Sequence, residues 1–415
     1  MKDHVIKQAR RAKEASRVLA LIPVEIRNKA LLAMADALEA QQDEILEVNA
    51  KEVEAVKEKG KRLNMLDRLI LTPKRIKDMA DGIRQVVNLD DPTSKIDFEV
   101  TRPNGLKIRR VRVPFGVVGI IYESRPNVTA DAISLCIKSG NSCILRGGSD
   151  VVRTNKKIVD IMKAAAAENG IPSTAIEFVG ILDRDVIVVM CRLRKFIDVI
   201  IPRGGAGLIS RVIEHSTVPV IETGTGICHT YVDKSANQDM ALKVCINAKT
   251  SRPSVCNAME TLLINKDIAE EFLPKVAKAM IDAGVELRGD EACLKICPEM
   301  KAAEEIDWET EYNDLILSVK IVDDVDAAIE HINQYSSAHS DAIITEDKDN
   351  AVKFQSVVDS ANVYVNASTR FTDGFEYGFG AEIGISTQKL HARGPMGLEA
   401  LTTMKYLIDG EGQIR

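Results

Sequence analysis

Cys256 lies between the end of a predicted helix and the strand-forming run Thr261–Ile264, which is a position suited to a nucleophile. A substrate can reach a thiol at such a junction. Backbone N–H groups at a chain reversal can also lower the pKa of the thiol and bind a developing oxyanion. Upstream, Glu222 stands beside the glycine-rich segment Thr223–Gly226. The sequence therefore offers a thiol, a carboxylate and glycine-rich turns for covalent catalysis.

Burial in the core is the alternative for Cys256, because the chain has eight cysteines and a free cysteine is usually a small buried hydrophobe. Most of the others lie in apolar runs, as Cys136 does, whereas Cys256 is followed by the polar Asn257. Cys293 and Cys297 lack the C-x-x-C spacing of a redox or zinc pair, and no histidine cluster lies beside them. We therefore expect a nucleophile at Cys256 and no metal site.

Length and composition exclude several classes of protein. Of the 415 residues, 45% are hydrophobic and 28% are charged, and the net charge is −6, which is typical of a globular enzyme without the basic excess of a nucleic-acid-binding protein. The start of the chain lacks the apolar core of a secretory signal, and no apolar run is long enough to span a bilayer. Cysteines without a spaced framework fit the reducing cytoplasm. This length predicts two or three domains.

The apolar pattern predicts helices followed by a hairpin. In the first part of the chain, residues such as Leu31 and Leu38 recur at helical spacing. Residues 97–113 then alternate in period two around Asn104-Gly105, a strong hairpin signal. Because an isolated hairpin is barely stable, we expect this one to pair with another sheet or subunit, and a surface flap beside Pro103 is the alternative.

From Val117 onward strands and helices alternate, which predicts parallel α/β sheets. We predict a first domain over residues 1–224, containing the helices and a cofactor-binding sheet and interrupted by the hairpin. A catalytic domain carrying Cys256 follows over residues 225–390. Residues 391–415 are predicted to be a C-terminal return and interface segment.

Two glycine-rich loops follow predicted strands, where ligands bind in α/β sheets. The segment Arg146–Ser149 follows one strand, and the segment Pro202–Gly207, which contains Gly204 and Gly205, follows another. Glycine lets the backbone approach a pyrophosphate closely, and the N-terminus of a following helix favours the anion. Neither loop has a complete G-x-G-x-x-G pattern, so ordinary turns are an equal alternative.

Three motifs carry a resemblance to a known family: Val113–Thr129, Lys249–Glu260 around Cys256, and Asp326–Ile343. Over essentially its whole length the chain resembles the aldehyde dehydrogenase superfamily, and within it the branch that reduces an acyl phosphate in proline biosynthesis. The resemblance implies an α/β fold of the aldehyde dehydrogenase type, with a Rossmann-type cofactor domain, an α/β catalytic domain and a small oligomerisation hairpin. It also implies a homo-oligomer.

The reaction that the resemblance implies is the reduction of L-glutamate 5-phosphate by NADPH to L-glutamate 5-semialdehyde and phosphate. Cys256 would attack the acyl carbon and form a thioester, which accepts hydride from the nicotinamide. Asn127 would stabilise the oxyanion together with the backbone N–H of Cys256. A turn-forming asparagine after Pro126 is the alternative. A hydrolysing or coenzyme A-acylating aldehyde dehydrogenase is the alternative function, and a catalytically silent protein on this fold is a further one.

Glu222 matches the carboxylate that activates water in the hydrolysing members of the superfamily. An enzyme that releases phosphate must keep water away from its thioester. A structural carboxylate is therefore the favoured interpretation of Glu222, and a role in the protonation of the thiol is the alternative.

The resemblance also implies cofactor contacts. Arg146 takes the place of a lysine near the adenosine ribose, and Ser149 stands where NAD-dependent members carry a carboxylate. An added cation without that repulsion favours the 2′-phosphate of NADPH over NADH. Glu311 resembles the glutamate that holds the nicotinamide ribose, and an exposed carboxylate at a helix end is the alternative.

The substrate carries a phosphate and an amino acid carboxylate, so its site needs cations. Arg125, Lys249 and Arg252 lie next to the two catalytic motifs, and a surface position or an internal ion pair is the alternative for each. Histidines such as His331 lie in the family motifs, but none is needed for catalysis. The length leaves no room for a kinase, so we expect a separate glutamate 5-kinase to supply the acyl phosphate.

Overall fold

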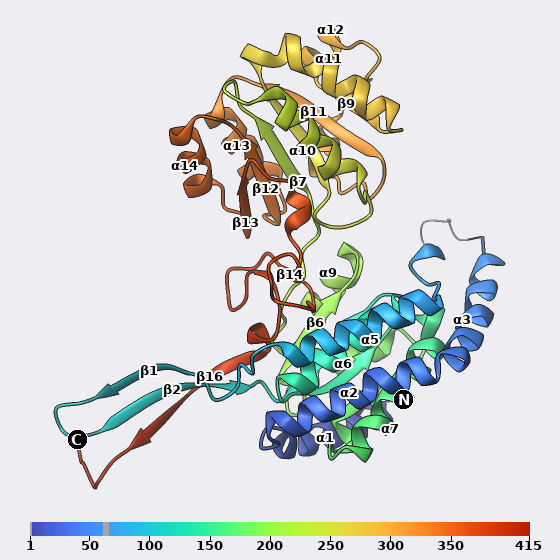
Figure 1. Cartoon of the computed structure of the whole chain (residues 1–415), viewed down its shortest axis with the longest axis vertical. Coiled ribbons are helices and arrows are strands. Elements are labelled where there is room, and N and C mark those ends of the chain that lie inside the picture. The colour runs from blue at the N-terminus through green and yellow to red at the C-terminus, as the bar shows by residue number, and fades with distance from the viewer. Residues whose placement is uncertain (1, 61–65) are drawn as a thin grey trace. The chain divides into compact units, whose positions relative to one another are not determined.

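The computed structural model of the chain describes residues 2–60 and 66–415 (Figure 1). It divides into two compact units. Unit 1 contains residues 1–223, 378–384 and 396–415, and unit 2 contains residues 224–377 and 385–395. The chain thus returns to unit 1 at Gly378, earlier than the predicted residue 391, and makes one more excursion into unit 2. No helix in the described part of the chain is long and apolar enough to cross a membrane.

The predicted N-terminal helices are confirmed. They are α1 (Lys2–Leu19), α2 (Val24–Ala40), α3 (Gln42–Lys57) and α5 (Pro73–Asn88). In α2, Leu31, Met34 and Leu38 are fully buried, so the face predicted by the helical spacing is the face that packs. The side chain of Thr72 accepts a hydrogen bond from the N–H of Arg75 and caps the start of α5.

Unit 1 contains a parallel four-stranded sheet in the order β5-β4-β3-β6. Its strands and their helices are β3 (Val117–Tyr122), α6 (Pro126–Lys138), β4 (Ser142–Arg146), α7 (Val152–Glu168), β5 (Ile176–Phe178), α8 (Asp185–Cys191), β6 (Val199–Arg203) and α9 (Ala206–His215). Residues 218–221 contribute only a single bridge to this sheet, from Val220 to Ile200. The carboxyl ends of β3, β4 and β6 therefore share one edge.

Unit 2 contains a parallel seven-stranded sheet in the order β10-β9-β11-β8-β7-β12-β13. Its strands are β7 (Cys228–Val232), β8 (Met259–Asn265), β9 (Glu286–Gly289), β10 (Lys301–Ala302), β11 (Ile316–Val322), β12 (Ser340–Ile344) and β13 (Asn362–Val365). Its helices are α10 (Gln238–Thr250), α11 (Lys266–Asp282), α12 (Glu291–Ile296), α13 (Val325–Tyr335) and α14 (Lys348–Val357). Separate apolar clusters involve α10, α11 and α12 on the one hand and α13 and α14 on the other. The short strands β9 and β10 were not predicted.

The predicted hairpin forms from β1 (Ile96–Thr101) and β2 (Lys107–Pro114), and the C-terminal strand β16 (Thr402–Asp409) extends it on the other side of β2 (Figure 1). Phe98 and Tyr406 lie opposite Arg110 on either side of β2, so their side chains share one face of this sheet. Phe98 is 47% exposed and Tyr406 is 56% exposed. The partner sheet expected for the hairpin is thus a strand of the same chain, and an apolar face remains open.

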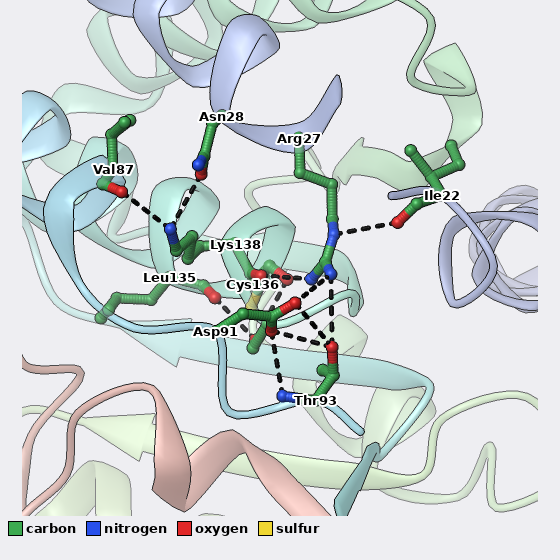
Figure 2. A network of polar contacts seen from close by, with 10 residues as sticks. Ile22, Arg27, Asn28, Val87, Asp91, Thr93, Leu135, Cys136 and Lys138 are labelled. Atoms are coloured by element: carbon green, nitrogen blue, oxygen red, sulfur yellow. Dashed lines mark hydrogen bonds and ion pairs between the residues drawn. The ribbon is translucent and has the colours of Figure 1, made fainter. Parts of the chain in front are cut away.

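A network of buried cations fixes the helices of unit 1 to one another (Figure 2). The guanidinium of Arg27 on α2 pairs with Asp91 at 2.7 Å and donates to the carbonyl oxygens of Ile22, at 3.1 Å, and Lys138. The ammonium of Lys138 donates in turn to Asn28 on α2 and to the carbonyl oxygen of Val87 on α5, each at 2.8 Å. Burial lowers the pKa of Lys138. The end of α6 is therefore held to α2, α5 and the segment leading to the hairpin.

Replacing Arg27 with methionine should lower the free energy of unfolding by about 3 kcal/mol, because the substitution leaves Asp91 without its cation and two carbonyl oxygens without the guanidinium donor. Urea unfolding followed by circular dichroism measures this loss. Arg84→Met is the matched control, since Arg84 pairs with Asp36, Glu39 and Asp81 at the surface. We expect the control to cost no more than about 1 kcal/mol. An equal loss in the two variants would contradict the role given to the buried network.

Candidate active site

The thiol of Cys256 lies in the turn between α10 and β8, as the sequence predicts. Seven cysteines are buried, and Cys256 is partly exposed. Burial raises the pKa of two of these thiols in unit 2, to about 12 for Cys245 and well above the ordinary value for Cys228. Cys256 is therefore the cysteine that a substrate can reach, and the competing interpretation as a core residue does not hold.

The backbone of Gly226 lies directly against the carbonyl of Cys256. A Cβ atom at position 226 would stand 1.5 Å from the carbonyl oxygen of Cys256, so only glycine fits. The N–H of Gly226 donates to Oε1 of Glu311 at 2.9 Å, and the thiol of Cys228 donates to the same Cys256 carbonyl at 3.2 Å. Glu311 is therefore bonded to the segment that supports the thiol loop and is not an exposed carboxylate at a helix end.

Lys249 lies deeper than the sequence analysis expected. It is 0% exposed, and its ammonium pairs with Glu260 on β8 at 2.5 Å. Burial lowers the pKa of Lys249 and raises the pKa of Glu260 to about 7. The predicted contact between Lys249 and the substrate is thus not supported, because the ammonium is used to join α10 to β8 behind the thiol loop. The internal ion pair was the alternative, and it is what the structure has.

Two arginines belong to or contact the loop that carries Cys256. Arg252 is exposed, four residues before the thiol. Arg370, in the short helix η4 (Thr369–Phe371), donates from Nε to the hydroxyl of Ser251 at 3.0 Å and from Nη1 to the side-chain oxygen of Asn257. The sequence analysis missed Arg370. Its only signal was a polar run after a strand, far from Cys256 in the chain.

Unit 1 has its own cavity of about 600 Å³ at the shared edge of β3, β4 and β6. It is rich in cations and is lined by Arg68, Leu69, Tyr122, Glu123, Ser124, Arg125, Arg146, Gly148, Ser149, Asp150, Arg184, Ile187, Gly207, Leu208 and Arg211. The predicted residues Arg125, Arg146 and Ser149 are brought together here. A cavity of this size and charge, at the carboxyl ends of parallel strands, suits a nucleotide.

Arg146 ends β4 and is 7% exposed. Its Nη2 donates to the carbonyl oxygen of Leu182 at 3.5 Å, and its buried Nε has no hydrogen-bond partner among the described residues. Burial lowers the pKa of Arg146, and the charge of Arg184 lowers it further. Arg146 and Arg184 line the same cavity, and the buried guanidinium of Arg146 is incompletely hydrogen-bonded. Two such cations fit a phosphate group.

A carboxylate lies beside Ser149, where the sequence predicted that none would repel a 2′-phosphate. Asp150 lines the same cavity and accepts a hydrogen bond from Ser124 at 3.3 Å. The predicted preference for a 2′-phosphate is therefore left to depend on the arginines and not on a lack of acidic groups.

The loop of Gly204 and Gly205 is less open to a pyrophosphate than predicted. The N–H of Gly205, at the start of α9, donates to Oε1 of Glu123 at 2.9 Å. A Cβ atom at Gly204 would lie 2.6 Å from Cγ of Glu123. The carboxylate of Glu123 thus takes the position at the helix start where an anion of the cofactor was expected, and Gly207 is the glycine of this loop that lines the cavity.

Asn127 lies exposed in the first turn of α6, which excludes its interpretation as a turn residue. Its side-chain amide donates to Asp131, one helical turn later, at 3.5 Å. Burial raises the pKa of Asp131 to about 7, while the charge of Arg203 acts in the opposite direction. Glu222 is partly buried in unit 1, and the structure leaves its two interpretations open.

Comparison with known proteins gives matches along the chain. A model of the Aldehyde dehydrogenase family matches residues 1–303 and 308–406. The Gamma-glutamyl phosphate reductase of Caldanaerobacter subterraneus is 56% identical over 408 residues, which are 98% of this chain and 99% of that protein. The protein of the same name from Clostridium botulinum strain Eklund 17B is 54% identical over 415 residues, which are 100% of both chains.

A solved structure agrees with these matches. The crystal structure of Gamma-glutamyl phosphate reductase from Thermotoga maritima is similar with a TM-score of 0.96 and 49% sequence identity, and the match covers 99% of each chain. The predicted resemblance and the predicted fold of the aldehyde dehydrogenase type are therefore confirmed.

His331, in the third motif, packs among aromatic rings of unit 2. The ring of His331 lies 5.4 Å from that of Trp308 and 4.7 Å from that of Tyr335, measured between centroids. Its Nε2 is buried without a hydrogen-bond partner among the described residues. Burial lowers the pKa of His331 to about 3, and the nearby His229 and Lys320 add to the effect.

His331 should therefore make the protein less stable in acid. Its pKa is about 6.5 in the unfolded chain and about 3 in the folded chain, so the stabilisation is complete above pH 6.5 and is lost as the pH falls toward 3. Urea unfolding at pH 6.5 and pH 4.5 should show that wild type loses about 2 kcal/mol more than His331→Phe over this interval. His4→Gln, at an exposed position of α1, is the control and should behave as wild type does. Parallel losses in wild type and His331→Phe would contradict the prediction.

Proposed function

Because the chain belongs to the gamma-glutamyl phosphate reductases of the aldehyde dehydrogenase family, we propose that it reduces L-glutamate 5-phosphate to L-glutamate 5-semialdehyde and phosphate with NADPH. The observation that carries the proposal is the accessible thiol of Cys256 in a loop whose backbone is fixed by Gly226, within a chain that matches these enzymes from end to end.

In the proposed mechanism the thiolate of Cys256 attacks the acyl carbon. A carbon–sulfur bond forms, the bond from carbon to the phosphate oxygen breaks, and phosphate leaves with the electron pair. Reduction of the thioester on Cys256 requires a hydride, which a nicotinamide cofactor would supply when bound. The resulting alkoxide then expels the thiolate, which restores Cys256 and releases the aldehyde.

The oxyanion formed in both steps needs hydrogen-bond donors. The side-chain amide of Asn127 and the backbone N–H of Cys256 are the proposed donors. The side-chain amide of Asn127 donates to Asp131 at 3.5 Å and has a further N–H that could donate to the oxyanion. No role as a base for water is assigned to Glu222, because water that reached the thioester would release glutamate and not the aldehyde.

The cavity of unit 1 is the proposed site for NADPH. Arg146 and Arg184 would hold the 2′-phosphate, and Ser149, which lines the same cavity, would contact the same ribose. Gly204 and Gly205 are proposed to have a supporting role, because their close packing on Glu123 shapes the loop beside the cavity. In unit 2, Glu311 already accepts from Gly226 through Oε1, and Oε2 is proposed to accept from the nicotinamide ribose.

Three further expectations accompany the proposed function. The open apolar face that contains Phe98 and Tyr406 is proposed to bind a second copy of the chain, because isolated exposed sheets of this kind associate. Arg125 and Arg252 are proposed to bind anionic groups of the substrate. A separate glutamate 5-kinase is the proposed source of the acyl phosphate, in the cytoplasm.

The Cys256→Ser variant tests the proposed reaction in reverse. Wild type should reduce NADP⁺ in the presence of glutamate 5-semialdehyde only when inorganic phosphate is added, and the variant should lose at least about 10³-fold in rate because its hydroxyl is a poor nucleophile. Absorbance at the NADPH band follows the reaction. Cys297→Ala, which removes a thiol from the core of the same unit, should keep most of the activity. Reduction of NADP⁺ without phosphate would instead indicate a hydrolysing dehydrogenase and return Glu222 to the role of base.

The Arg146→Gln variant tests the proposed cofactor preference. Loss of the charge should raise the KM for NADPH about tenfold or more and leave the KM for NADH nearly unchanged, since a hydrogen bond to a charged group contributes about 1.5–3 kcal/mol. Initial rates with each cofactor at saturating substrate measure the effect. Arg192→Gln, at an exposed position outside the cavity lining, is the control. Equal increases for both cofactors would argue against a contact with the 2′-phosphate.

A further inference from the structure

A segment far along the chain is tied to the thiol loop of unit 2 by hydrogen bonds. The side-chain amide of Asn257, the residue directly after Cys256, donates to the carbonyl oxygens of Arg370, at 3.2 Å, and Thr372, at 2.8 Å. In return the hydroxyl of Thr369 donates to the carbonyl oxygen of Asn257 at 2.7 Å. Asn257 is buried, so these bonds fix the backbone at residues 369–372 against the backbone that carries the thiol.

The guanidinium of Arg370 is held in place by neutral groups. Its Nε donates to the hydroxyl of Ser251, and its Nη1 donates to the side-chain oxygen of Asn257. In the part of the chain that the structure describes, no acidic side chain forms an ion pair with Arg370. Arg370 is therefore a positioned, partly buried cation whose charge is not neutralised by direct contact.

The electrostatic surroundings agree with this geometry. Burial lowers the pKa of Arg370, and the charge of Arg252 lowers it further, whereas Cys256 and Asp373 act in the opposite direction. Two cations and the thiol thus interact within one small region. A dianionic group that entered this region would be attracted by both arginines.

The chemistry of the reaction selects which anionic group this is. The leaving phosphate is bonded to the carbon that the thiol attacks, and reacting atoms approach within roughly 3–3.5 Å, so the phosphate must lie close to Cys256. The amino acid carboxylate is at the far end of the substrate. Because the guanidinium is anchored to the residue that follows the thiol, it is near the leaving group and not near that far end.

We propose that Arg370 binds the phosphoryl group of the substrate, stabilises the phosphate as it leaves, and binds inorganic phosphate in the reverse reaction. The guanidinium has N–H donors beyond the two that Ser251 and Asn257 engage, and these donors match phosphate oxygens. Charge builds up on the phosphate as its bond to carbon breaks, so a fixed cation lowers the barrier to formation of the thioester. This inference rests on the proposed function, to which it adds a phosphate site.

The reverse reaction tests the proposal with inorganic phosphate as the varied substrate. We expect Arg370→Gln to raise the KM for phosphate about tenfold or more and to change the KM for glutamate 5-semialdehyde by less than about twofold. Arg370→Lys should recover part of the loss, because it keeps the charge without the planar fork. Lys278→Gln is the control, since Lys278 is an exposed cation of α11 paired with Asp282 at 2.7 Å, and it should match wild type.

Two further measurements keep the outcomes distinct. Ser251→Ala removes an anchor of the guanidinium but no charge, so a smaller rise in the KM for phosphate is expected. If Arg370→Gln does not fold, the two single variants Ser251→Ala and Arg370→Lys test the proposal in its place. An unchanged KM for phosphate in the Arg370 variants, or an equal rise in both KM values, would overturn the phosphate site and leave the proposed function standing. Phosphate-independent activity in wild type would overturn the proposed function itself, and the phosphate site with it.

Discussion

The contact between the backbone of Gly226 and the carbonyl of Cys256 is the constraint on which the arrangement of unit 2 depends. No side-chain atom fits between the two segments, so the start of β7 and the approach to β8 are joined backbone to backbone. Beside this contact, the N–H of Gly226 donates to Glu311 and the thiol of Cys228 donates to the carbonyl of Cys256. The backbone therefore holds the thiol in position, and the nearby side chains remain available to provide charge and to bind a ligand.

The cations of this chain fall into two groups that differ in how their charge is balanced. Arg27 and Lys249 are paired with carboxylates, and Lys138 is surrounded by oxygens, so these three tie structural elements together. Arg146 and Arg370 are also restrained, but by neutral oxygens that leave the positive charge without a matching negative one. An unbalanced charge in a restrained position costs stability, and a ligand that supplies the missing charge recovers that cost. This difference distinguishes the cations proposed to bind ligands from those that join structural elements better than position in the sequence does.

Much of the fold follows from local pattern, whereas the balance of charges does not. The alternation of strands and helices, the Asn104-Gly105 hairpin and the accessible position of Cys256 could all be predicted, because each depends on residues close together in the chain. The burial of Lys249 could not, since its partner Glu260 is reached only once α10 packs on β8. Arg370 was missed for the same reason, because its contacts with Ser251 and Asn257 span more than a hundred residues. The carboxylate of Asp150 was one position away from the residue considered, and only the shape of the cavity shows that it lines the site.

Unit 1 combines segments that lie far apart in the chain, which has a consequence for its biosynthesis. Strand β16 pairs with β2 through contacts such as that between Arg112 and Thr402, 290 residues apart. On the ribosome, residues 224–377 of unit 2 emerge before β16 exists, so the larger part of unit 2 can fold while β2 still presents an unpaired edge. Such an edge is a template for wrong strand pairing. A strand that is synthesised late thus completes a unit that was started early, and its pairing with β2 covers an edge that would otherwise be open to wrong strand pairing.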